Sequence, residues 1–320
     1  MDDPGNPLPA VMNPAMDGRE WGLLVLLTAV WSGTFFLNAV ALAAYPAASV
    51  VAGRLIPAAL LLLLLVRLTR RPMPIGAKDL GAYLVMGALN GAIPFGLIVW
   101  GQTRIDSGLA AILNAATPLF TVLLAHFLTD NERLTLRRLA GVAVGVFGVA
   151  LVVGPDAWSG LTGDALGQLA VLGAALSYAL ASIWGRRFRA RAPATAAAGQ
   201  VGAAAILVLP VWLILDRPWT LAVDGEALLA LAGVSVFGTA VAYVIYFSIL
   251  RSAGSTNLML VTLLMPFGAI ALGSAFLGER IGAYALAGMA LIVAGLVTID
   301  GRALSALSRR LGRRPRRAAP

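Results

Sequence analysis

The chain has 320 residues, of which 59% are hydrophobic and 12% are charged, whereas a soluble domain has about 25% charged residues. A soluble fold of this length cannot bury so much apolar surface, so the composition indicates a membrane protein. The sequence has no cysteine and one histidine, His126. It therefore offers no disulfide, no thiol nucleophile and no cluster for a zinc site or a Ser/His/Asp triad. We expect no cofactor, no metal and no enzymatic activity.

The net charge of +9 does not indicate a nucleic-acid partner. Six of the 24 Lys and Arg residues lie within 309–317, and most of the others flank apolar runs. Charges that orient membrane helices are placed in this way, whereas a nucleic-acid-binding protein gathers them along one face.

Residues 1–18 contain four prolines and three aspartates. They lack the basic and apolar regions of a secretion signal, and we predict a disordered cytoplasmic tail. Ten apolar runs follow, each close to the roughly 20 residues that a bilayer core of about 30 Å requires. The ten spans, numbered in chain order, are 21–43, 47–67, 80–101, 107–128, 135–154, 165–185, 194–215, 227–249, 255–277 and 282–299. Because they do not alternate as β-barrel strands do, the sequence predicts an all-α membrane protein.

Basic residues predict how the spans are oriented. With a cytoplasmic N-terminus, 20 basic residues fall in cytoplasmic segments and three fall outside, namely Arg104, Arg217 and Arg280. This bias predicts that both termini are cytoplasmic, including a basic tail at 301–320.

The chain also repeats itself at an offset of about 146 residues. Glu132-Arg133 followed by Leu139-Ala140-Gly141 recurs as Glu279-Arg280 followed by Leu286-Ala287-Gly288. The repeats are expected at 19–155 and 156–300. Since each has five spans, the second must enter the membrane from the opposite side, as in many secondary transporters.

Polar residues within the spans are the candidates for a site. An amide in lipid costs a few kcal/mol unless it is hydrogen-bonded, and its four bonding positions are difficult to satisfy. Asn38, Asn90 and Asn114 are therefore predicted to face a cavity. For single Ser and Thr residues, hydrogen bonds between helices are the more common role.

Pro118 and Pro266 hold equivalent places in the fourth and ninth spans, and a kink or break is expected at each. Matched interruptions point to a transporter's binding site, although the prolines can also simply bend packed helices. Thr117 adjoins Pro118, Thr262 lies one turn before Pro266, and Asn257 lies further back.

Aromatic residues add a second set of candidates. Tyr243 and Tyr246 are three residues apart, on one helical face, and Trp100 aligns with Tyr246 at the repeat offset. Such rings can stack on an aromatic substrate or lie over a cation; for Trp100 an aromatic belt facing lipid is equally expected. Arg54 lies well within the second span, where a structural role is favoured over binding a substrate carboxylate.

Several stretches carry a family resemblance. Trp31-Ser32-Gly33-Thr34-Phe35 with Arg54-Leu55 resembles the start of an EamA repeat, and residues 109–153 and 258–299 each resemble its last two helices. The resemblance implies the drug/metabolite transporter superfamily, and the chain is similar to the YddG-type exporters of aromatic and other neutral amino acids. It implies an inner-membrane exporter with a central, uncharged cavity lined by spans 1, 3, 4, 6, 8 and 9, working by alternating access.

The expected partners are a small-molecule substrate and the lipid bilayer; the oligomeric state stays open. The substrate-binding candidates are Asn38, Asn90, Trp100, Asn114, Thr117, Tyr178, Tyr243, Tyr246, Asn257 and Thr262, and the kink or gating candidates are Pro118 and Pro266. A drug, nucleotide-sugar or lipid carrier on the same scaffold is the main alternative. A channel lacks the expected filter or charge rings, and an intramembrane enzyme lacks paired catalytic groups. No acidic residue falls at mid-bilayer, so proton coupling through a carboxylate is not expected.

Overall fold

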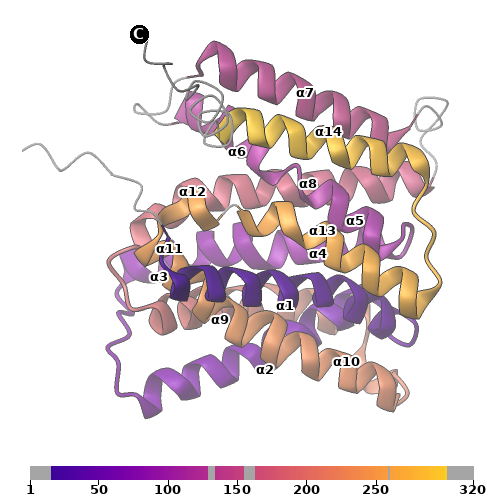
Figure 1. The fold of residues 1–320 in the computed structure, drawn as a ribbon. Coiled ribbons are helices and arrows are strands. Elements are labelled where there is room, and N and C mark those ends of the chain that lie inside the picture. The colour runs from indigo at the N-terminus through magenta and orange to yellow at the C-terminus, as the bar shows by residue number, and fades with distance from the viewer. Residues whose placement is uncertain (1–15, 129–133, 155–162, 259, 301–320) are drawn as a thin grey trace, which may run out of the picture.

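The computed structural model describes residues 16–128, 134–154, 163–258 and 260–300, and their regular structure is helical throughout (Figure 1). This confirms the predicted all-α class. In chain order the elements are α1 (Gly18–Leu42), α2 (Ala47–Leu68), α3 (Ala77–Gly87), η1 (Ala88–Ala92), α4 (Ile93–Gln102), α5 (Ser107–Asn114), α6 (Thr117–Leu128), α7 (Leu136–Val153), α8 (Gly163–Trp184), η3 (Gly185–Phe188), α9 (Pro193–Leu215), η4 (Pro218–Thr220), α10 (Gly225–Ser235), η5 (Val236–Val241), α11 (Ala242–Ser252), α12 (Gly254–Leu258), α13 (Leu260–Leu272), η6 (Gly273–Leu277) and α14 (Ala283–Asp300).

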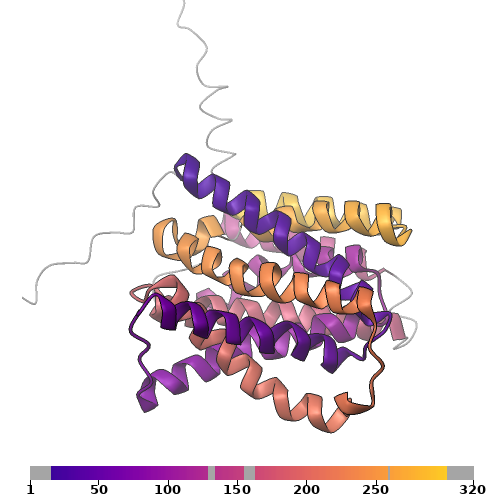
Figure 2. The ribbon, with the colours of Figure 1, turned by 90° about the horizontal axis from the view of Figure 1, so that it is seen from below.

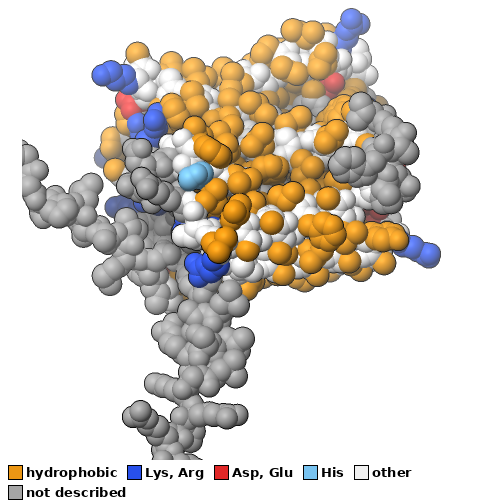
Figure 3. All heavy atoms as spheres, turned by 90° about the horizontal axis from the view of Figure 1, so that it is seen from above, with side chains coloured by type: hydrophobic (Ala, Val, Ile, Leu, Met, Phe, Trp, Pro, Cys, Tyr) orange, Lys and Arg blue, Asp and Glu red, His pale blue; other side chains and the backbone are white. Residues whose placement is uncertain are grey.

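These helices form the predicted spans. Within the described residues, nine helical runs are long and apolar enough to cross a membrane, and the tenth span is the shorter apolar helix Ala283–Ile299. The third span joins α3, η1 and α4, and the eighth joins α10, η5 and α11. Apolar side chains cover the face over α7 and α14, with Lys and Arg gathered near its ends (Figure 3). Such an apolar belt is the surface that lipid covers.

The first helix begins where its sequence caps it. The Asp17 side chain accepts a hydrogen bond from the Glu20 amide at 2.8 Å, and the Glu20 side chain accepts one from the Asp17 amide at 3.1 Å. This capping box satisfies amides that a helix start leaves without partners. The predicted tails at 1–18 and 301–320, and the motif Glu132-Arg133, lie largely or wholly outside the described residues.

The two halves of the chain are interleaved. α2 packs against α9, α4 against α8, α1 against α13 and α10, and α7 against α14, so each of these contacts joins one repeat to the other. α7 and α14 lie side by side along one edge of the bundle (Figures 1 and 2). Neither repeat has a core of its own, because its helices bury their faces mainly against the other repeat.

Contacts between the repeats also tie both ends of the bundle. α1 begins and α14 ends at one end (Figure 1). The turns from α2 to α3 and from α8 to α9, and the end of α11, also belong to this end, which we call the basic end because they carry Arg67, Arg70, Arg71, Lys78, Arg186, Arg187, Arg189, Arg191 and Arg251. At this end Arg191 pairs with Asp79 and donates to the Tyr83 hydroxyl. At the opposite end Asp216 accepts from the Ser49 hydroxyl at 2.8 Å.

Several of the spans that line the cavity contain irregular helical segments, among them η6 at the end of the ninth span. The third and eighth spans contain π-helical segments, η1 and η5, at matching depths, and such segments are frequent at functional sites. In the fourth span the helix stops at Asn114 and restarts at Thr117, just before Pro118. Of the kink or break expected at Pro266, a break is excluded, because α13 continues through this proline. There the Ser32 hydroxyl donates to the Met265 carbonyl at 2.9 Å, one of the contacts that pack α1 on this turn.

Candidate functional site

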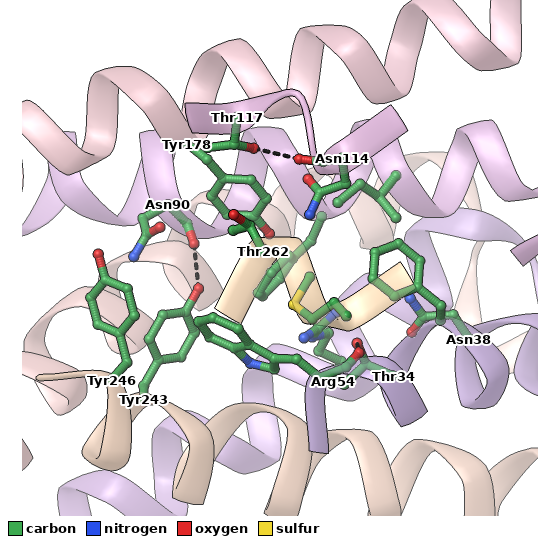
Figure 4. Close-up of a pocket in the computed structure, with 15 residues that line it drawn as sticks. Thr34, Asn38, Arg54, Asn90, Asn114, Thr117, Tyr178, Tyr243, Tyr246 and Thr262 are labelled. Carbon is green, nitrogen blue, oxygen red and sulfur yellow. Dashed lines mark hydrogen bonds between the residues drawn. The ribbon is translucent and has the colours of Figure 1, made fainter. Parts of the chain in front are cut away.

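A cavity lies between the two repeats. The space between its lining atoms measures about 670 Å³, a volume that includes open solvent. Its lining residues are Trp31, Thr34, Phe35, Asn38, Arg54, Asn90, Phe95, Ile98, Asn114, Thr117, Tyr178, Tyr243, Tyr246, Thr262 and Met265 (Figure 4). They come from spans 1, 3, 4, 6, 8 and 9, together with Arg54 from the second span.

Helical periodicity explains most of this lining. Trp31, Thr34, Phe35 and Asn38 follow one another at i, i+3, i+4 and i+7, which is one face of α1. Pairs three residues apart line it from the other helices, for example Asn114 with Thr117 and Tyr243 with Tyr246. One helical face from each span therefore faces the cavity.

The residues that line the cavity lie at equivalent positions in the two repeats. Phe95 and Ile98 of the third span are each 148 residues from Tyr243 and Tyr246 of the eighth. Asn114 and Thr117 of the fourth span are likewise 148 residues from Thr262 and Met265 of the ninth. The two repeats thus present equivalent positions to one shared space, with different side chains at each.

Aromatic rings form one wall. The ring centroid of Trp31 lies 6.1 Å from that of Tyr243 and 5.9 Å from that of Tyr246, and the two tyrosine rings lie 5.8 Å apart. Phe95 continues the wall at 6.4 Å from Tyr243. These separations are in the range of favourable edge and tilted contacts, so the rings form a continuous aromatic surface.

Hydrogen bonds hold the tyrosine and asparagine side chains in place. The Tyr243 hydroxyl donates to the Asn90 carbonyl, and the Asn90 amide donates to Oε1 of Gln200 at 3.0 Å (Figure 4 draws the first). On the other side Asn38 donates to Oε1 of Gln102 at 3.2 Å. Both asparagines are thereby fixed at the cavity surface by residues behind them.

The break in the fourth span has a chemical cause. Pro118 has no amide hydrogen, so the carbonyl of Asn114 loses its normal helical donor. The Thr117 hydroxyl replaces it, donating to that carbonyl at 2.7 Å (Figure 4). The opened turn places Asn114 and Thr117 at the cavity.

Arg54 corrects the expectation of an uncharged cavity. Its side chain is 4% exposed, its guanidinium carbon lies 3.6 Å from the ring centroid of Phe95, and Nε donates to the Thr239 hydroxyl at 3.0 Å. The long side chain reaches from the second span to η5, where Nη2 also donates to the Gly238 carbonyl at 3.4 Å.

Eight of the ten predicted binding residues line the cavity; Trp100 and Asn257 do not. Trp100 is 37% exposed and stacks beneath Arg104 at 3.8 Å; the offset of 146 residues aligned it with Tyr246, whereas the cavity pairs Ile98 with Tyr246. Asn257 is fully buried, with its amide bonded to the Ala253 carbonyl at 3.0 Å. Trp31, Phe35 and Phe95 were missed, although Trp31 and Phe35 share one helical face with Thr34 and Asn38.

Comparisons with known proteins agree on the family. The model of the EamA-like transporter family matches residues 20–154 and again residues 165–299. The chain is 23% identical to the uncharacterized transporter YoaV of Bacillus subtilis (strain 168), over 85% of this chain and 94% of that protein. It is 28% identical to a probable amino-acid metabolite efflux pump of Escherichia coli (strain K12), over 88% of this chain and 94% of that protein.

Two further matches extend the comparison. The uncharacterized inner membrane transporter YedA of Escherichia coli (strain K12) is 24% identical over 87% of this chain and 90% of that protein. One solved crystal structure superposes with a TM-score of 0.62 at 20% identity, covering 92% of this chain and 99% of that chain, a likeness that concerns the fold. With one family match in each half and a cavity between the halves, the chain belongs to the EamA-like transporter family and is a multi-pass membrane transporter.

Proposed function

We propose that this transporter exports small metabolites, in particular neutral and aromatic amino acids, across the inner membrane of a bacterium. Both termini would lie in the cytoplasm, on the side that the basic end faces. The observation that carries the proposal is the shared cavity, to which the two repeats contribute equivalent positions. Because the repeats are inverted, exchanging their conformations would turn an opening at one end into an opening at the other.

The helix interruptions suggest how such an exchange takes place. The third and fourth spans carry η1 and the break before Pro118, and the eighth carries η5. In these segments the regular helical hydrogen bonding is altered, so the helix bends there at lower cost than elsewhere. We expect the third and fourth spans to move as one pair, and the eighth and ninth spans as another, around the central cavity.

The chemistry of the cavity suits amino acids. The wall of Trp31, Tyr243 and Tyr246 offers aromatic contact to an apolar or aromatic side chain, and Asn38, Asn90 and Asn114 offer hydrogen bonds to polar groups. The relative named as an amino-acid metabolite efflux pump supports the same class of substrate.

Counterflow in proteoliposomes tests the proposal. Vesicles holding the purified full chain and unlabelled amino acid would be diluted into labelled L-phenylalanine, with competitors covering aromatic, aliphatic, basic and acidic amino acids, an organic cation and a nucleotide sugar. We expect transient accumulation of label that neutral amino acids abolish. Tyr246→Ala should weaken exchange, whereas Tyr284→Ala, at a tyrosine 68% exposed on α14, should not. Exchange driven only by the cation or the nucleotide sugar would overturn the proposal.

A further inference from the structure

The cavity holds a buried cation that no described carboxylate neutralises. Arg54 donates through Nε to Thr239 and through Nη2 to the Gly238 carbonyl at 3.4 Å. Arg54 is not part of the ion pair recorded among the described residues, which joins Arg191 to Asp79 at the basic end. Burying a charge in a membrane protein costs several kcal/mol unless it is paired. A guanidinium with five donors thus retains capacity for an anion at the cavity wall.

The other repeat shows that the fold does not require this charge. Gln200 of the seventh span stands where Arg54 stands in the second, at the offset of 146 residues. Each side chain crosses to the π-helical segment of the other repeat: Gln200 bonds Asn90 in η1, and Arg54 bonds Thr239 and Gly238 in η5. A neutral amide performs the structural task on one side. The charge on the other side therefore calls for a separate explanation.

The same cavity contains acceptors without donors. Oδ1 of Asn38 and Oδ1 of Asn114 are buried and accept no hydrogen bond within the described part of the chain. Both asparagines line the cavity with Arg54 (Figure 4). The cavity thus offers free donors on a cation and free amide oxygens, and no described carboxylate lines it. This arrangement is complementary to a molecule that carries both an anionic group and an ammonium group.

We propose that Arg54 binds the carboxylate of the transported amino acid, that amide oxygens of the asparagines accept from its ammonium group, and that the Trp31–Tyr243–Tyr246 wall receives its side chain. This inference rests on the proposed function and names the feature by which the cavity selects its substrates. A solute with an ammonium group and no carboxylate meets an uncompensated positive charge. The transporter accordingly discriminates against amines and organic cations, which separates it from a carrier of cationic drugs.

Three matched ligands test the inference on the full chain in nanodiscs: L-phenylalanine, 3-phenylpropionate, which lacks the ammonium group, and phenethylamine, which lacks the carboxylate. The variants are Arg54→Gln, which copies the side chain tolerated at Gln200, Arg54→Lys, which keeps the charge, and Arg104→Gln as a control outside the cavity. Size-exclusion profiles and melting temperatures verify that each variant is folded.

Wild-type protein should bind L-phenylalanine best and phenethylamine least. Arg54→Gln should lower the affinity for both carboxylates by about 10- to 100-fold, the effect expected for loss of a charge-assisted hydrogen bond, without weakening phenethylamine. Arg54→Lys should restore part of the loss, and Arg104→Gln should match wild type.

The experiments distinguish failure of the carboxylate assignment from failure of the proposed function. If amino acids exchange in counterflow but Arg54→Gln leaves carboxylate affinity unchanged, or weakens all three ligands equally, the carboxylate assignment is wrong while the proposed function survives. If no amino acid exchanges in the wild-type protein, the proposed function and this inference both fail.

Discussion

Glu279 joins the second repeat to the first at the end of the bundle opposite the basic end. Its Oε1 accepts the Ser107 amide at 2.8 Å and its Oε2 accepts the Gly108 amide at 3.0 Å. These amides begin α5, where the helix dipole favours negative charge. A Cβ at Gly273 would lie 2.2 Å from Oε2, so the glycine is needed for the approach. One residue of the second repeat thereby caps a cavity-lining helix of the first.

We expect Glu279→Gln to favour opening of the end opposite the basic end. A glutamine keeps one acceptor oxygen and no charge, so the cap weakens by about 1–2 kcal/mol. Because the chain has no cysteine, a single Thr34→Cys reports access to the cavity through its labelling rate with a polar maleimide in nanodiscs.

The labelling rate should rise several-fold in the Glu279→Gln background, by roughly the Boltzmann factor of that energy. Glu226→Gln, at an exposed carboxylate of the same end, is the control and should leave the rate unchanged. Equal rates in all three backgrounds would show that Glu279 does not hold this end closed.

At the scale of single elements, the third, fourth and eighth spans meet the cavity as interrupted helices, whereas α1 and α8 meet it as continuous ones. The fourth span is broken at Ala115 and Ala116, while the ninth passes through Pro266 within α13. A proline within a helix costs about 3 kcal/mol. At Pro118 the chain accommodates that cost by opening a turn and recruiting the Thr117 hydroxyl.

Pro118→Ala restores a backbone donor to the Asn114 carbonyl, so α5 and α6 should join more closely. We expect turnover in counterflow to fall roughly five-fold or more because a flexible joint is stiffened, while the affinity for substrate changes little. Pro266→Ala, in a helix that is already continuous, is the matched control and should have a smaller effect. Unchanged turnover in Pro118→Ala would show that the break does not serve movement.

The α7–α14 pair depends on contact between backbones. A Cβ at Gly148 would lie 2.7 Å from the Gly288 carbonyl oxygen, and one at Gly295 would lie 2.5 Å from that of Gly141. Small residues allow such approach in membranes, where helices associate through packing. Neither helix contributes a residue to the cavity lining.

Gly148→Leu should therefore destabilise the protein without changing its specificity. Overpacking of a tight contact costs about 1–3 kcal/mol, which we expect to appear as a melting temperature several degrees lower in detergent. Gly22→Leu, where a Cβ has no neighbour within 4 Å, should melt as wild type does. A change in relative affinity among amino acids in Gly148→Leu would contradict the separation of scaffold from cavity.

For the whole molecule, the repeats are interleaved, and each wall of the cavity is shared between them. None of the carboxylates in the described segments lines the cavity, and a buried carboxylate is the usual carrier of a coupled proton. The molecule thus has an arrangement suited to exchange or facilitated diffusion.

We predict that a pH gradient does not drive uptake uphill. Proteoliposomes with an acidic or alkaline interior should bring labelled phenylalanine to the same internal concentration as the outside solution, and a protonophore should change nothing. Protein-free vesicles control for leakage. Accumulation above the external concentration that the protonophore collapses would contradict the prediction.

The sequence by itself determined the spans, their number, the repeat and the polar positions most expensive to leave in lipid. Asn38, Asn90 and Asn114 were identifiable because an amide surrounded by apolar residues must find partners wherever the helix turns. Pro118 was identifiable for a similar reason, since the missing donor is a property of the residue itself.

The tertiary structure alone decided which face of each helix meets the cavity. Lipid is as apolar as leucine, so hydrophobicity does not record the rotation of a membrane helix about its axis. The packed bundle thus leaves Asn257 away from the cavity lining and brings Phe95 into it. Arg54 donates to the carbonyl of Gly238, which lies 184 residues away in the chain, and only the packed bundle brings the two together.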